Sequence, residues 1–164
     1  MEVFISNKLK KFLPPNEEAS TASPSEKWSA HLNYYDRRKF ILFTHKETRY
    51  SFFLPGYRKS SLSDMGDLIA HNLGIQLEVD GININKAMKY LNFNPNKVYF
   101  LKTDNDQKTL GWIRDIFKNI EYLQDYHGGN AFINAMSYAH RSMNRIPIGR
   151  TGKSPIELLN EQLK

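Results

Sequence analysis

The densest group of cationic and imidazole side chains lies between residues 28 and 59. A guanidinium group presents a planar fork of donors that matches a phosphate, and neighbouring tyrosines can stack on bases. We therefore expect a site for a phosphate-bearing ligand, nucleic acid or a nucleotide, with these binding residues from this stretch: His31, Arg37, Arg38, Lys39, His45 and Arg49. The alternative interpretation is a hairpin whose charged outer face only protects a sheet edge from aggregation.

A second basic stretch runs from Gly149 to Ser154 and has the sequence GRTGKS. It is not a phosphate-binding Walker loop, because that pattern requires glycine five residues before Gly152, where Pro147 stands. The stretch indicates a basic turn that precedes a capped helix. From this turn, Arg150 could add positive charge to the same anion site.

Signals for catalysis or metal binding are weak. The chain has no cysteine, so thiolate nucleophiles and cysteine-ligated zinc are excluded. His127 and His140 are isolated, and residues 104–106 (DND) lack the glycine and distal glutamate of a calcium loop. We expect no metal and no cofactor. One enzymatic alternative stays open: a small phosphodiesterase or nuclease that uses His31 or His45.

The elements that must position these side chains are three strands. Residues 28–35 alternate between two faces, residues 39–44 are apolar on both faces, and residues 49–54 alternate again. The connections at Asp36-Arg37 and at residues 45–48 are short, so the strands should pair as antiparallel neighbours. The sequence thus predicts a meander with residues 39–44 in its centre.

The remainder of the chain is mostly helical in pattern. Short strands are expected at residues 3–5 and 98–102, and helices at about 61–79, 86–91, 110–126, 130–143 and 155–163. Strands come mainly early and helices mainly late. This order predicts an α+β fold, with a mostly antiparallel sheet built on the meander and helices packed mainly on one face.

Length and composition limit the number of domains and the location of the protein. At 164 residues the chain fits one domain over residues 1–164, and we expect a mobile loop at 14–27. No apolar run approaches the roughly 20 residues of a membrane span, and no signal peptide is evident. We expect no membrane association and a cytoplasmic location.

The formal net charge of +6 is unevenly distributed. Lys and Arg exceed Asp and Glu in the first 59 residues and after residue 140, whereas residues 60–140 are slightly acidic. An excess of this kind favours an anionic partner. The alternative is a protein-interaction or inhibitor protein of a mobile element, in which the aromatic surface around Phe52, Phe53 and Tyr57 forms the contact.

Several motifs resemble those of an uncharacterised family of small bacterial domains that also occur in phages and plasmids. The similarity rests on these segments: ISNKLKKFL (5–13), WSAHL with DRRK (28–39), ILFT with TRYSFFLPG (41–56), KTDNDQKTLG (102–111), MNRIPI (143–148) and SPIE (154–157). The resemblance implies a single compact domain and supplies no mechanism. Relatives often carry an arginine in the loop after Thr103, where this chain has residues 104–107 (DNDQ).

Overall fold

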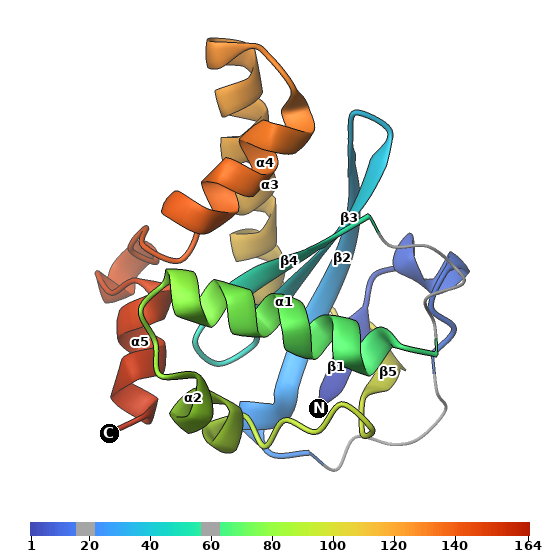
Figure 1. Ribbon diagram of the computed structural model, residues 1–164, viewed down its shortest axis with the longest axis vertical. Coiled ribbons are helices and arrows are strands. Elements are labelled where there is room, and N and C mark those ends of the chain that lie inside the picture. Colours follow the sequence, from blue (N-terminus) through green and yellow to red (C-terminus); the bar gives the residue numbers. More distant parts are fainter. Residues whose placement is uncertain (16–21, 57–62) are drawn as a thin grey trace.

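The computed structural model describes residues 1–15, 22–56 and 63–164, which fold into one five-stranded sheet flanked by helices (Figure 1). The strand order is β4-β3-β2-β1-β5. The two antiparallel pairings are longer than the two parallel ones, so the sheet is mixed but mostly antiparallel. The predicted α+β class is confirmed.

The predicted meander consists of β2 (Lys27–Tyr35), β3 (Arg38–His45) and β4 (Ser51–Pro55). The β2–β3 hairpin closes through Asp36 and Arg37, whose φ angles are 49° and 64°. Positive φ at both positions characterises the two-residue turn whose twist matches that of the flanking strands. The meander places Lys39 at one end of β3 and His45 at the other.

The sheet continues through β1 (Glu2–Ile5) and β5 (Tyr99–Lys102), both parallel to β2. β1 stops beside Ala30, where the Ser6 N–H donates to the Ala30 carbonyl at 3.0 Å. β2 continues to Tyr35. Within the described residues, no strand therefore pairs with the last part of β2 on the β1 side.

Helices cover both faces of the sheet, whereas the sequence predicts them mainly on one. One core lies under α1 (Met65–Val79), α2 (Ile84–Tyr90), α5 (Pro155–Gln162) and the 3₁₀ helix η1 (Leu9–Lys11). The other core lies under α3 (Gln107–His127) and α4 (Ala131–Arg141). Strand β3 requires this arrangement, because it points Ile41 and Phe43 into the first core and Phe40 and Leu42 into the second.

Local signals set most helix ends. The Asp106, Asn130 and Ser154 side chains accept hydrogen bonds from backbone N–H groups in the first turns of α3, α4 and α5. The Ser154–Glu157 capping box is present as predicted, and Gly128 ends α3. Helix α1 begins later than the expected residue 61, and Asp64 occupies its N-cap position.

The stretch after α4 is fixed to the edge strand β4. The Asn144 side-chain amide accepts from the Ser51 N–H and donates to the Ser51 carbonyl, each at 2.8 Å. It thereby pairs with the outer backbone of β4 much as another strand would. The same amide nitrogen donates to the buried Asp80 carboxylate, which also accepts from Tyr50 and forms an ion pair with Arg145.

Part of the loop expected at residues 14–27 is ordered by hydrogen bonds. Residues Pro24–Glu26 form a 3₁₀ helix, η2, and the Asn92 amide donates to the Glu26 carboxylate at 2.8 Å. Residues 16–21 lie outside the described residues. None of the helices in the described ranges combines the length and apolar character needed to cross a bilayer.

Candidate functional site

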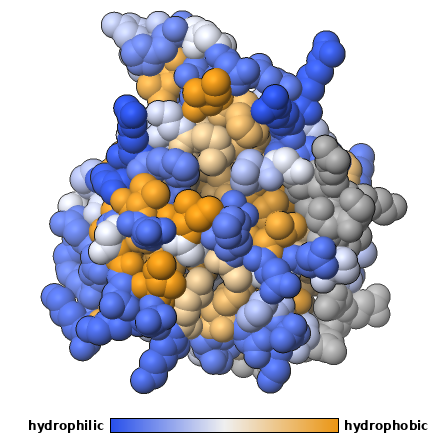
Figure 2. All heavy atoms as spheres, viewed as in Figure 1, coloured by the Kyte–Doolittle hydropathy of each residue, from blue (hydrophilic) through white to orange (hydrophobic). Residues whose placement is uncertain are grey.

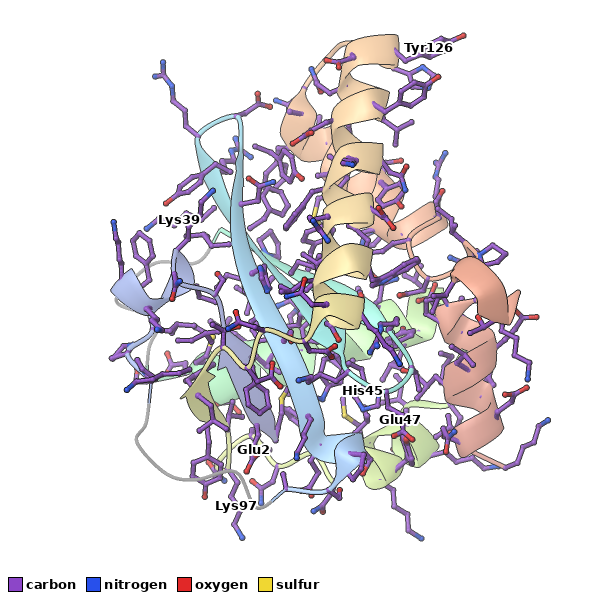
Figure 3. The ribbon with its side chains drawn as sticks, turned by 180° about the vertical axis from the view of Figure 1, so that it is seen from behind. Glu2, Lys39, His45, Glu47, Lys97 and Tyr126 are labelled. Carbon is purple, nitrogen blue, oxygen red and sulfur yellow. The ribbon has the colours of Figure 1, made fainter. Side chains whose placement is uncertain are left out.

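Most of the predicted binding residues lie near the two ends of the β2–β3 hairpin, whereas His31 pairs with Leu42 in its middle. Arg38 pairs with Tyr35 beside the turn, whereas His45 pairs with Trp28 at the far end of the same strands. Figure 3 shows Lys39 and His45 at these opposite ends. The structure therefore brings Arg37, Arg38 and Lys39 together and separates them from His45 and Arg49.

His45 is fully buried and occupied by structural contacts. Its Nε2 lies 3.2 Å from the Ser25 carbonyl oxygen, and its Nδ1 lies 2.9 Å from Thr48 Oγ1. The ring packs against Trp28 with centroids 5.0 Å apart. Burial lowers the pKa of His45 to about 4. A neutral imidazole that solvent does not reach is positioned for stability and cannot touch a ligand in this conformation.

Arg49 lies near acidic side chains rather than near the other predicted binding residues. It has a positive φ of 63°, and burial lowers its pKa while the nearby Asp106 carboxylate raises it. Lys46 forms ion pairs with Asp104 and Asp106 in the same region. The remaining predicted residue, Arg150, lies in the 3₁₀ helix η4 (Gly149–Thr151), and its side chain lies outside the described part of the structure.

Cations from the hairpin turn and from η1 share one end of the molecule. The Lys39 ammonium lies 3.8 Å from the centre of the Phe12 ring, which fixes the hairpin beside η1. On the opposite sheet face, the Arg38 guanidinium lies 4.6 Å from the centre of the Phe132 ring. We call the following six side chains the basic end: Lys8, Lys10, Lys11, Arg37, Arg38 and Lys39.

The charges of the basic end are not neutralised within the described part of the chain. No described carboxylate lies within 4.0 Å of these six side chains, whereas Lys46, Arg145 and Lys153 all have such partners. Asp36 is in the turn itself, but one of its carboxylate oxygens accepts from the Phe132 N–H at 3.1 Å. The basic end therefore presents a positive potential to solvent.

Two pockets flank the free edge of β2 at the basic end. A pocket of about 410 Å³ lies on the α3 side and one of about 470 Å³ lies on the η1 side. Asn7, Lys8 and Leu32 line both, so the pockets meet around the edge. We call them together the edge groove, lined by Ser6, Asn7, Lys8, Lys11, Phe12, His31, Leu32, Asn33, Tyr34, Phe117 and Glu121.

The edge groove also contains backbone hydrogen-bonding groups. Because the Ala30 carbonyl faces β1, the backbone groups of Leu32 and Tyr34 face the same side by the two-residue period of a strand. The Tyr34 N–H donates to its neighbour, Asn33 Oδ1, at 2.9 Å. His31 lines the α3 side, and burial lowers its pKa to about 4, so the imidazole is neutral near pH 7.

Sequence reasoning missed the lysines of η1 as site residues. The signal was present as the run KLKK at residues 8–11. Nothing in the local sequence shows that this turn lies against the hairpin. The contact that joins them is the stacking of Lys39 on Phe12.

The structure defines a small α+β domain with a mixed five-stranded sheet, helices on both faces and a basic groove at a free strand edge. A family model with the description "Domain of unknown function (DUF6933)" matches residues 2–158. The chain therefore belongs to the DUF6933 family. No curated protein and no solved structure matches it significantly. Among the described residues, no three His, Asp or Glu side chains gather closely enough to hold a metal ion.

Proposed function

We propose that this protein is a binding module for a phosphate-bearing ligand, and that the ligand is single-stranded nucleic acid held in the edge groove. The observation that carries the proposal is that Lys8 and Lys11 line two joined pockets, with the Lys39 ammonium stacked on Phe12 beside them. No described carboxylate pairs with these cations. Such a module is expected in the cytoplasm.

Each part of the groove suits one part of a nucleotide chain. Lys8 and Lys11 would hold phosphates along the η1 side, and Arg37 would extend this path to the hairpin turn. The Tyr34 ring is 47% exposed and offers a flat surface on which a base can stack. Because stacking on a tyrosine ring requires an unpaired base, this groove suits a single strand better than a duplex.

The test is fluorescence anisotropy of a fluorescein-labelled oligothymidylate at increasing NaCl concentrations. Replacement of Lys8 and Lys11 together by Gln should weaken binding by about tenfold or more, because two charge-assisted contacts are lost. The slope of log K against log [NaCl] should become shallower by about 0.7 for each lost phosphate contact. The matched control replaces Lys86 and Lys89, two exposed lysines of α2, by Gln.

Three outcomes would contradict this proposal. One is the absence of oligonucleotide binding at low salt. Another is an equal loss of affinity in the Lys86/Lys89 control, which would indicate diffuse attraction to net charge. The third is an affinity that does not change with NaCl concentration, because binding to a nucleic-acid polymer releases counterions and must weaken as salt is added.

A protein partner is the second candidate, favoured by an exposed apolar patch on another surface. Ile75, Val79 and Ile84 are 38%, 41% and 38% exposed, and they gather over the C-terminal end of α1 and the start of α2 (Figure 2). The prediction that Phe52 and Phe53 form an aromatic contact surface is wrong. Both rings are buried, one in each core, because β4 is covered on both faces. Tyr57 lies outside the described residues.

The hydrolase alternative depends on His31. His45 is fully buried, whereas His31 is a neutral imidazole in the pocket that Glu121 also lines. Its activity would appear as cleavage of the same labelled oligonucleotide on a denaturing gel. That cleavage should disappear in His31→Ala while binding is retained.

A further inference from the structure

A further cavity lies away from the edge groove, between α3 and the extended segment that follows α4. Its volume is about 520 Å³, within the range of roughly 300–1,000 Å³ found for small-molecule sites. We call it the α3 groove, lined by Gln107, Lys108, Gly111, Trp112, Asp115, Lys118 and Asn119 of α3 and by residues 146–149.

Gly111 leaves a gap in this groove that the protein itself does not use. It lies inside α3, where glycine costs about 1 kcal/mol relative to alanine. A Cβ atom at Gly111 would meet no other atom within 4 Å. Gly66 is different, because a Cβ there would lie 1.9 Å from the Pro95 carbonyl oxygen. Packing thus explains the glycine at 66 and does not explain the one at 111, which opens onto the cavity.

Both walls of the α3 groove are held by the same strand residue. The Trp112 Nε1–H donates to Ser51 Oγ at 3.3 Å, and Asn144 pairs with the Ser51 backbone two residues before the opposite wall begins. These contacts fix α3 and the 146–149 segment relative to β4. The groove is therefore preformed, which lowers the entropic cost of binding a ligand.

The lining combines apolar residues on both walls with separated polar groups. Trp112 lies on the α3 wall and Ile146, Pro147 and Ile148 lie on the opposite wall, so a flat ring system can lie between them. Lys108 and Lys118 are ten residues apart on α3, which places their backbones about 15 Å apart at 1.5 Å per residue. Asp115 and Asn119 lie between and beside them, and their oxygens can accept hydrogen bonds from hydroxyl groups.

We propose that the α3 groove binds a nucleoside monophosphate. The base would lie between the two apolar walls beside Gly111, and the ribose hydroxyls would donate to Asp115. Lys108 or Lys118 would bind the phosphate. This site is separate from the edge groove in residues and in ligand: no residue lines both, and a mononucleotide replaces the polymer.

The test is isothermal titration calorimetry of the wild-type protein with AMP, GMP, CMP and UMP, and then with the matching nucleoside and with inorganic phosphate. We expect at least one monophosphate to bind, and to bind about tenfold or more tightly than its nucleoside, because a charge-assisted contact is absent from the latter. Gly111→Leu should abolish binding by filling the gap. Gly74→Leu is the matched control, since Gly74 is also a helical glycine with no atom within 4 Å of a Cβ and lies on α1.

The results separate this proposal from the proposed nucleic-acid function. The Lys8/Lys11 double variant should bind the monophosphate as the wild type does, whatever its affinity for oligonucleotides. The inference fails if none of the four monophosphates binds, if the nucleoside binds as tightly as its monophosphate, or if Gly111→Leu retains binding. A fold defect is recognised by circular dichroism, and for such a variant Gly111→Ala, which adds one methyl group, should show a weakened affinity.

Discussion

His45 links the stability of the protein to pH. Its Nδ1 faces the Thr48 N–H and hydroxyl, while its Nε2 donates to the Ser25 carbonyl. A second ring proton would have to replace the acceptor role of Nδ1 and would put a charge in a site without solvent. Burial accordingly lowers the pKa to about 4 from an ordinary value of 6.5.

We predict that acid destabilises the fold through His45. Because the folded-state pKa is below the unfolded-state pKa, the contribution of His45 is complete above pH 6.5 and is lost as pH falls towards 4. This single group should cost about 2 kcal/mol of unfolding free energy between pH 7 and pH 5. Urea denaturation at the two pH values measures the loss, which should be smaller by that amount in His45→Gln.

His71→Gln is the control for this measurement, since His71 is exposed on α1. Its loss of stability between the two pH values should match that of the wild type. An equal pH dependence in His45→Gln and the wild type would show that His45 accepts a proton without penalty.

At the scale of elements, the glycines of α1 show how a helix meets the loop beside it. Gly66 lies in the first turn, where the backbone carbonyl of Pro95 approaches so closely that no side chain fits. Gly74 lies two turns later and has no such neighbour. The loop that leads to β5 therefore packs directly on the start of α1, and this contact helps to place β5 at the sheet edge.

We predict opposite effects of alanine at these two glycines. Gly66→Ala should destabilise the protein by about 2 kcal/mol or more, because the Cβ contacts backbone that cannot rotate away. Gly74→Ala should stabilise it by about 0.5–1 kcal/mol through helix propensity alone. Thermal unfolding followed by circular dichroism gives both values. If Gly66→Ala left the stability of the protein unchanged, the loop at Pro95 would have to move away from the new methyl group without cost.

At the scale of the whole molecule, the two faces of one sheet contribute side chains to two separate hydrophobic cores. Leu73 of α1 and Ile120 of α3 are both fully buried, on opposite faces of the sheet. Strand β3 contributes alternate side chains to both cores. Neither set of helices can lose its packing without exposing one face of the same strands, so the two cores should unfold together.

We predict a single unfolding transition for core variants on either face. Leu73→Ala and Ile120→Ala should each lower the unfolding free energy by about 2–5 kcal/mol without changing the urea m-value. Fluorescence and far-ultraviolet circular dichroism should give coincident curves for both variants. Separate transitions, or a halved m-value in one variant, would show that the α3–α4 layer unfolds independently.

The sequence by itself determined the features that depend on near neighbours along the chain. The alternation of residues 28–35 placed Trp28, Ala30 and Leu32 on one face of β2, where they pack into the first core, and the Asp36-Arg37 turn fixed the hairpin register. The Ser154 capping box predicted the start of α5. Period and capping are visible in sequence because hydrogen bonds and side-chain direction within one element depend on residues only a few positions apart.

Only the tertiary structure decided which side chains meet. β1 inserts beside β2 and ends early, which leaves a free edge, and η1 brings Lys8 and Lys11 beside that edge. The length of β3 separates Lys39 from His45, although only five residues lie between them in sequence. Burial decides that His45 is structural while His31 lines a pocket. These contacts arise because two helical layers pack on one sheet. Such packing brings together residues that are far apart along the chain, and no local sequence pattern predicts which of them will meet.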